Sequence, residues 1–294
     1  MTAASVERVT TRWVVTGAAG LLGHDLVAVL RVRDDAETTA LTRADLDITD
    51  PEAVLQAVAG HDVVLNAAAW TDVDGAEAAE DAAHAINAVG AANVAAAAAR
   101  HGARLVHVST DYVFAGDATS PYAEDADPAP RSAYGRTKLA GERAVLESGA
   151  RASVVRTAWV YGLHGKNFVA TMLRLAGGDG PVDVVDDQRG SPTWSADLAA
   201  ALVALGASQA PDSVYHVTNR GETTWYGLAR AVFAGAGADP GRVRPTTTDK
   251  FPRPAPRPAY SVLGTARWDS HDLPAPRHWS EALAYALLAM SARP

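Results

Sequence analysis

The chain has 294 residues, of which 48% are hydrophobic and 20% charged, so it can bury a large core as one domain or as two closely joined ones. The formal net charge is -8 and the 26 basic residues form no run, which argues against nucleic acid or an anionic membrane as a partner and favours a small-molecule substrate. Cysteine is absent, which excludes disulfides, thiolate metal sites and a cysteine nucleophile.

The N-terminal stretch MTAASVERVTTRW carries charged residues where a secretory signal has its apolar core. No apolar run in the sequence approaches the ~18 residues that a membrane span needs. We therefore expect a cytoplasmic protein.

From Arg12 onward, short β-branched runs alternate with longer alanine-rich segments, a pattern that predicts a parallel sheet covered by helices on both faces. The predicted strands are 13–16, 38–41, 62–66, 104–109 and 153–157, and helices are predicted at 51–59 and 78–100. Residues 1–158 are therefore expected to form a doubly wound α/β domain.

The pattern changes after Trp159. The segment TWSADLAAALVAL spans 193–205, a strand is predicted at 214–217 and a helix at 225–234, while the proline-rich residues 244–263 are predicted as an ordered connecting loop. Residues 159–294 should form mainly a smaller C-terminal α/β lobe, with elements that return to the first sheet. A cleft between the two parts is the natural ligand site.

A glycine-rich turn follows the first predicted strand in WVVTGAAGLLGHDLVAVL, where Gly17, Gly20 and Gly23 separate a β-run from an apolar-periodic helix. Such glycines allow a tight turn, close approach of a pyrophosphate, and close packing of the helix. The helix would begin near Leu21 and Leu22 and present its free N–H groups to phosphate. This predicts a Rossmann-type, NAD(P)-binding first domain; the alternative is an ordinary strand-to-helix turn.

Arg43 stands twenty positions after Gly23, where the NAD fingerprint has an acidic residue for the ribose 2′-hydroxyl. A guanidinium at this place attracts a 2′-phosphate and so favours NADPH, with NADH as the alternative. Asp45 and Asp47 are close enough in sequence to bind the adenosine instead, and Arg43 could also be a solvated surface charge.

Tyr134 and Lys138 lie four residues apart in SAYGRTKLAGE, so on a helix their side chains share one face. Chance alone also produces this spacing. The pair becomes informative only together with the other motifs of the chain.

Six motifs in one order, TGAAGLLG, NAAAWTDVDGAE, HVSTDYVFAG, SAYGRTKLAGE, RTAWVYG and DDQRGSPT, make the chain resemble the extended short-chain dehydrogenase/reductases, and more narrowly the dTDP-4-dehydrorhamnose reductases. The resemblance covers nearly the whole chain. It implies NADPH-dependent reduction of the C4 keto group of dTDP-4-dehydro-β-L-rhamnose to dTDP-β-L-rhamnose, with the smaller lobe binding the substrate.

The resemblance assigns catalysis to Thr110, Tyr134 and Lys138. Tyr134 would protonate the former carbonyl oxygen, and the ammonium of Lys138 would bring the phenol's pKa closer to working pH and reach the nicotinamide ribose. Thr110 would donate a hydrogen bond to the same oxygen. The alternative for Thr110 is a strand-terminal hydroxyl bonded to local backbone.

The resemblance also implies that Ala69, Trp70 and Thr71 contact the nicotinamide half of the cofactor. Asp47 and Ile48 would flank its adenine side.

On the substrate, the resemblance places Asp111 against a sugar hydroxyl and Trp159 against the sugar nucleotide, and Arg257 is the best candidate for the pyrophosphate. The alternatives are a turn residue for Asp111, a core tryptophan for Trp159, and pairing with a surface carboxylate for Arg257. For three further polar residues, a structural role is as good an interpretation as a functional one: Asn66, Asn87 and Ser109.

No metal is expected to take part in catalysis, since the nine histidines show no ligand spacing. Some members of the resembled family form dimers around Mg²⁺ held by two glutamates. Asp25 and Ala196 stand at those places here, so a Mg²⁺-bridged dimer is not favoured, and a monomer or weak homodimer is expected.

Three other functions share much of this pattern. A sister reductase of a related dTDP-4-keto-6-deoxy sugar, for example in dihydrostreptose formation, has overlapping motifs. A non-catalytic regulatory subunit of the same fold is disfavoured by the intact catalytic residues. A dehydratase would carry a glutamate after Asp111, where this chain has Tyr112.

Overall fold

The computed structural model describes residues 10–292. The expectation that the chain begins without a secretory signal concerns residues that lie mostly outside this range, at positions 1–9.

A parallel sheet of six strands forms the centre of the molecule, in the order β10-β5-β4-β3-β1-β2. Its strands are β1 (Thr11–Thr16), β2 (Ala36–Leu41), β3 (Val63–Asn66), β4 (Arg104–Thr110), β5 (Arg151–Thr157) and β10 (Val214–His216). The strand order reverses beside β1, as in doubly wound folds. The predicted α/β fold class is confirmed, and β10 is an element of the second half that returns to this sheet.

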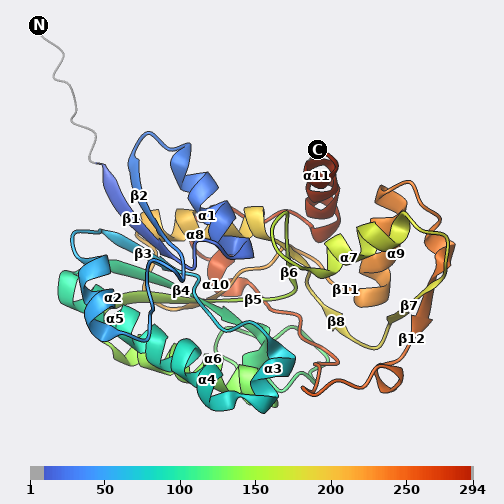
Figure 1. Cartoon of the computed structure of the whole chain (residues 1–294), viewed down its shortest axis with the longest axis horizontal. Coiled ribbons are helices and arrows are strands. Elements are labelled where there is room, and N and C mark those ends of the chain that lie inside the picture. The colour runs from blue at the N-terminus through green and yellow to red at the C-terminus, as the bar shows by residue number, and fades with distance from the viewer. Residues whose placement is uncertain (1–9, 293–294) are drawn as a thin grey trace, which may run out of the picture.

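Helices cover both faces of the sheet (Figure 1). On one face lie α1 (Leu21–Arg31) and α8 (Ser195–Ala207), and on the other α2 (Pro51–Val58), α5 (Ala91–His101) and α6 (Ala133–Glu147). Successive strand residues point to opposite faces, so Val14 enters the core under α2 and α5 while Val15 enters the core under α1 and α8.

The helix predicted at 78–100 is interrupted. It consists of α4 (Glu80–His84), a π-helical turn η1 (Ala85–Gly90), and α5, and the extra residue of the π turn comes where Asn87 bonds the backbone of Trp70. Glu80–His101 is long and apolar enough to cross a membrane by composition, but half of it is buried inside the fold. The run of alanines at 95–99 therefore lets α5 pack closely on the sheet.

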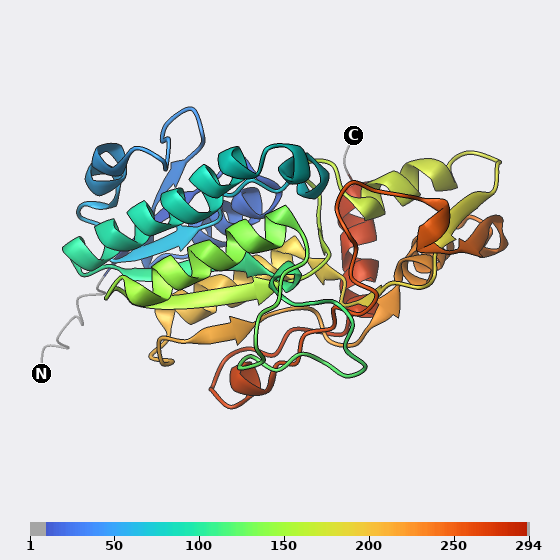
Figure 2. The ribbon, with the colours of Figure 1, turned by 90° about the horizontal axis from the view of Figure 1, so that it is seen from below.

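A smaller lobe lies beside the carboxyl end of the sheet, toward which the strand arrows point (Figure 2). Its core is a cluster of buried side chains that includes Val169, Leu228, Phe233 and Leu283. Its main elements are α7 (Phe168–Ala176), β7 (Val182–Val185), α9 (Trp225–Gly235), β12 (Val243–Thr246) and α11 (Trp279–Ser291).

Short elements complete the described part of the chain. They are α3 (Val73–Ala78), η2 (Asp111–Val113), β6 (Val160–Tyr161), β8 (Arg189–Gly190), β9 (Thr193–Trp194), β11 (Thr223–Thr224), η3 (Pro240–Arg242), η4 (Thr248–Lys250) and α10 (Ala266–Asp269).

The proline-rich segment is only partly the predicted loop. Its first residues form β12, which pairs with β7 at the edge of a two-stranded ladder, where Pro245 is tolerated. The rest is held by backbone bonds to both halves of the molecule, such as Tyr260 N–H to Gly116 O (2.9 Å) and Ser261 N–H to Arg189 O (2.8 Å).

Candidate functional site

A cavity of about 760 Å³ opens at the carboxyl ends of β1, β3 and β4, next to the reversal of strand order where ligands of such sheets bind. Most residues predicted for the site line it: Gly17, Gly20, Leu21, Leu22, Gly23, Arg43, Asp47, Ile48, Ala69, Thr71, Thr110, Asp111, Tyr134, Lys138 and Trp159. Two predicted residues, Trp70 and Arg257, do not.

The glycine turn forms one end of this cavity. Gly17 has φ +70°, and a Cβ there would lie 2.7 Å from the backbone nitrogen of Ala68. A Cβ at Gly23 would collide with the carbonyl oxygen of Gly17, so this glycine lets α1 pack directly on the turn. Gly20 caps α1 without a side-chain hydrogen bond, and the first turn has no acidic residue. The N-terminus of α1 is therefore suited to an anion.

Arg43 lies beside this end of the cavity with two carboxylates that are already engaged. Asp47 accepts from the backbone and hydroxyl of Thr49 (2.9 and 2.8 Å), and Asp45 accepts from Thr42 in the same way (2.9 and 2.6 Å). These bonds lower the pKa of both carboxyls. Within residues 10–292, Arg43 makes no hydrogen bond or ion pair, and its charge contributes to the lowered pKa of Asp47, so its guanidinium N–H groups are available to a phosphate.

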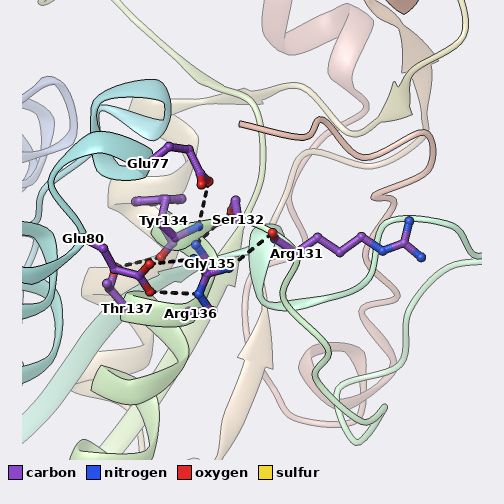
Figure 3. A network of polar contacts seen from close by, with 9 residues as sticks. Glu77, Glu80, Arg131, Ser132, Tyr134, Gly135, Arg136 and Thr137 are labelled. Carbon is purple, nitrogen blue, oxygen red and sulfur yellow. Dashed lines mark hydrogen bonds and ion pairs between the residues drawn. The ribbon is translucent and has the colours of Figure 1, made fainter. Parts of the chain in front are cut away.

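Tyr134 and Lys138 lie on α6, whose start is tightly held (Figure 3). Ser132 accepts from Gly135 N–H (3.1 Å) and caps the helix. A Cβ at Gly135 would collide with the carbonyl oxygen of Tyr112, so this glycine lets the helix approach the end of β4.

Two glutamates from α3 and α4 also hold the first turn of α6 (Figure 3). Glu77 accepts from Ala133 N–H (2.8 Å), and Glu80 forms an ion pair with Arg136 (2.6 Å). The helix start, and Tyr134 with it, is therefore fixed from two sides.

Burial controls the protonation of the predicted catalytic pair. It raises the pKa of Tyr134, with the hydroxyl of Thr110 acting in the opposite direction. It lowers the pKa of Lys138 to about 8, with Glu142 opposing. The ammonium of Lys138 donates to Val108 O (2.7 Å), on β4. The expected lowering of the tyrosine pKa by Lys138 is therefore wrong for this structure, because loss of hydration dominates and the ammonium bonds a carbonyl.

Thr110 and Asp111 end β4 at the cavity wall. The hydroxyl of Thr110 donates to Asp111 Oδ1 (3.0 Å) and accepts from Tyr112 N–H (3.2 Å), which is the local bonding given above as its alternative role. Asp111 is 3% exposed, and burial raises its pKa to about 6. Its Oδ2 has no hydrogen-bond partner among the described residues. A buried carboxylate oxygen on a cavity wall is suited to a hydroxyl donor.

The position of Trp159 fits both a core tryptophan and a residue that contacts the sugar nucleotide. Its ring stacks on Trp225 at 3.6 Å between centroids and packs against the core of the smaller lobe, yet it also lines the cavity. Its φ of 48° is the one positive value among the described non-glycine residues. The strained residue stands where the chain leaves β5 for the second lobe.

Trp70 is turned toward protein rather than toward the cavity. Its indole N–H donates to Asp72 O (2.8 Å), and its ring packs against a buried cluster of Ala76, Ala83 and Ala133. The predicted contact of Trp70 with the nicotinamide therefore has no support from its position.

Arg257 lines a separate cavity of about 120 Å³ that shares Tyr112 with the large one. Its guanidinium forms a 2.8 Å ion pair with Asp74, a half-buried carboxylate. The structure therefore has the alternative given above for Arg257, pairing with a carboxylate, because the proline-rich segment passes over the start of α3.

Two of the three ambiguous polar residues have structural roles. Asn66 accepts from Thr16 Oγ1 (2.7 Å) and bonds His107, while Asn87 binds both Trp70 and Thr137. Ser109 donates to Glu142 (2.5 Å) and also lines the cavity.

Sequence reasoning missed other residues of the cavity wall, notably Thr49, Tyr112, Val160 and Lys166. The available signals for Lys166 were its rarity, since the chain has only three lysines, and its position four residues after the RTAWVYG motif.

Asp25 lies on α1, at the place where the resembled family has a Mg²⁺ ligand on its first helix. It accepts a hydrogen bond from Ser195 and so ties α1 to α8. Across residues 10–292, no group of three or more histidine and acidic side chains is arranged to hold a metal ion.

Three comparisons place these features among known proteins. The sequence model described as RmlD substrate binding domain matches residues 11–291. A dTDP-4-dehydrorhamnose reductase of Mycobacterium tuberculosis (strain ATCC 25618 / H37Rv) is 53% identical over 283 residues, covering 95% of this chain and 93% of the relative. A Streptomyces antibioticus protein described as a probable dTDP-4,6-dihydroxy-2-methyloxan-3-one 4-ketoreductase is 51% identical over 280 residues, covering 94% of each.

Among solved structures, a dTDP-4-dehydrorhamnose reductase from Bacillus anthracis in complex with NADP superposes with a TM-score of 0.91 at 37% identity, covering 96% of this chain and 100% of that chain.

Proposed function

The chain belongs to the RmlD substrate binding domain family, and from this premise we propose that it is an NADPH-dependent reductase that converts dTDP-4-dehydro-β-L-rhamnose to dTDP-β-L-rhamnose. One observation carries the proposal. A single cavity joins a glycine turn suited to a dinucleotide phosphate with Thr110, Asp111 and Tyr134, the groups suited to a sugar carbonyl.

The residues at the glycine turn fit a phosphorylated dinucleotide. The first turn of α1 has neither a side-chain cap nor an acidic residue, and Arg43 is unpaired within the described range. NADPH supplies the hydride that reduces C4 of the sugar. Gly17 and Gly23 would form the turn that holds the dinucleotide diphosphate, and Arg43 would bind the 2′-phosphate.

Tyr134 is the proton donor. Its raised pKa keeps the phenol protonated at neutral pH, so the proton is in place when negative charge develops on the C4 oxygen. The hydroxyl of Thr110, which donates to Asp111 in the structure, would turn from that carboxylate to donate to the same oxygen, and Lys138 would bind the ribose that carries the nicotinamide. Asp111 accepts a hydrogen bond from a sugar hydroxyl through its unpaired Oδ2.

Residues 1–158 carry the cofactor site and residues 159–294 mainly the substrate side. Trp159, at the junction, packs on the sugar nucleotide, and Arg257 reaches the substrate diphosphate by leaving Asp74. The protein acts in the cytoplasm as a monomer or weak homodimer, without nucleic acid or membrane. The net charge of -8 supports this assignment.

A second candidate is a reductase of a related dTDP-4-keto-6-deoxy sugar. The similarity to the S. antibioticus ketoreductase, at 51% identity, is nearly as high as that to the mycobacterial reductase, at 53%. The residues that protonate the carbonyl are compatible with either sugar.

The test supplies purified protein with enzymatically made dTDP-4-dehydro-L-rhamnose and follows NADPH absorbance, with the product identified by chromatography. We expect NADPH consumption and dTDP-L-rhamnose. A higher kcat/KM with another dTDP-4-keto sugar would favour the second candidate. No consumption with any such sugar would refute the reductase function.

A further inference from the structure

Lys166 is a cation on the wall of the large cavity to which the reaction above assigns no role. It lies in the loop 162–167, which connects β6 to α7 in the smaller lobe. The other cations on the wall are Arg43, at the adenosine end, and Lys138, beneath the nicotinamide ribose in the proposed arrangement.

The loop that carries Lys166 has a defined shape. Asn167 donates to Gly162 O (2.8 Å), which closes the loop across its two ends. The same side chain accepts from Ala170 N–H (2.9 Å) and caps α7. One residue therefore fixes both the loop and the helix that follows it.

The loop packs on the first turns of α1. A Cβ at Gly162 would lie 3.3 Å from Leu21 Cδ2, and a Cβ at Gly165 would lie 4.0 Å from Leu21 Cβ. The ring of His164 stacks on that of His24, with centroids 4.0 Å apart and an angle of 14° between planes. Lys166 is thus held beside Leu21, the first residue of the anion-binding helix end.

The charge of Lys166 is not used elsewhere in the described part of the chain, where it has no hydrogen bond or ion pair. A diphosphate at the start of α1 would bring two negative charges beside it. The helix end supplies only partial charge, so a full ammonium nearby would complete the neutralisation.

We propose that Lys166 binds the dinucleotide diphosphate from the side opposite the glycine turn, so that the smaller lobe contributes directly to cofactor affinity. The inference rests on the proposed NADPH site. Two other phosphate groups could bind the ammonium of Lys166, the 2′-phosphate of NADPH and the diphosphate of the sugar nucleotide. The experiment below distinguishes these three phosphate groups.

The experiment measures dissociation constants of NADPH, NADH and dTDP for the wild type, Lys166→Gln and Lys166→Arg by calorimetry. NADPH and NADH share the diphosphate, so Lys166→Gln should weaken both by the same factor, about tenfold, with dTDP unchanged. Lys166→Arg should recover most of the affinity, and the loss in Lys166→Gln should shrink at high salt.

Two variants serve as controls. Lys250→Gln removes an exposed lysine of η4 that lies off the cavity and pairs with Asp249, and it should change none of the three constants. Arg43→Gln should weaken NADPH but not NADH.

Three results would overturn the inference: unchanged dinucleotide binding in Lys166→Gln, weakening of NADPH alone, or weakening of dTDP alone. Failure of the wild type to bind either dinucleotide would instead refute the proposed function on which the inference rests. Thermal unfolding of each variant separates loss of binding from loss of fold.

Discussion

Tyr134, the proposed proton donor, shows how burial keeps a weak acid protonated. Its phenol is kept protonated by loss of hydration, and the edge of the ring of Tyr112 packs against it with centroids 5.6 Å apart. The nearest expected source of a lowered pKa, Lys138, donates to a strand carbonyl instead. In this state the phenol of Tyr134 keeps its proton at neutral pH.

Replacing Tyr134 by Phe should leave NADPH affinity within about twofold of the wild type and lower kcat by about 10²-fold or more, because only the proton donor is lost. Steady-state kinetics with NADPH titration checks both parts. Tyr285→Phe, at an exposed position of α11, is the matched control. Near-normal turnover in Tyr134→Phe would exclude the assigned role.

Asp111 should make the stability of the protein depend on pH. Its pKa rises from 3.8 to about 6 on folding, so the folded state holds the proton more tightly than the unfolded state. The associated stability is therefore complete below about pH 4 and is lost as pH rises through 6. At neutral pH the buried carboxylate costs about 3 kcal/mol of folding stability.

Asp111→Asn should accordingly raise Tm at pH 7 and lose this advantage near pH 4, while KM for the sugar nucleotide increases. Thermal melts across pH 4 to 8, with activity assays, test this. A variant that is equally destabilised at both pH values would contradict the expectation.

At the scale of elements, the site depends on how closely two helices approach two strand ends. The turn after β1 is compact because Gly23 admits α1, and the turn after β4 is compact because Gly135 admits α6. Behind α6, Glu142 pairs with Arg156 of β5 (2.7 Å), and both side chains are almost completely buried. A buried, well-bonded pair of this kind fixes the helix on the sheet.

Gly23→Ala should destabilise the fold by about 1–3 kcal/mol and weaken NADPH and NADH binding at least tenfold, because its methyl group would meet Gly17 O. Urea unfolding and dinucleotide titration give the two values. Gly180→Ala is the control, since a Cβ there meets nothing within 4 Å. Equal behaviour of the two variants would show that close packing at the turn is not required.

At the scale of the whole molecule, the proline-rich segment holds the two parts together. Asp74, at the start of α3, accepts from Ala255 N–H (3.2 Å) and from Arg257 (2.8 Å), and Tyr260 N–H binds Gly116 O (2.9 Å). The segment belongs to the second half of the sequence, but these partners belong to the first. The proline-rich segment therefore connects the sheet domain to the smaller lobe.

Asp74→Ala should speed amide hydrogen exchange at Ala255 by about tenfold or more, because it removes the acceptor of that N–H. Exchange at Tyr260 should change little, since its acceptor is backbone. Asp269→Ala, which removes an exposed pair with Arg220 and a hydrogen bond from the Thr265 hydroxyl, is the control and should leave both amides unchanged. Unchanged exchange at Ala255 in Asp74→Ala would mean that Asp74 does not hold the segment.

Local patterns predicted much of this molecule, because they have local causes. Alternating β-branched and helical segments gave the parallel sheet, and glycines set between a strand and a helix marked the turn that opens the cavity. The six motifs in order indicated the family that the comparisons show. Prediction from the local pattern failed where long-range contacts decide the structure, as at the π turn around Asn87 and at β12.

The sequence by itself determined the strand and helix alternation, the glycine turn and the helical spacing of Tyr134 and Lys138, since each depends on neighbours along the chain. Tertiary structure alone decided that Trp70 faces protein, that Arg257 pairs with Asp74, and that Lys166 lies beside the start of α1. It also decided the protonation of Tyr134 and Asp111. Burial and long-range contact cause these outcomes, and neither is a property of a short stretch of sequence.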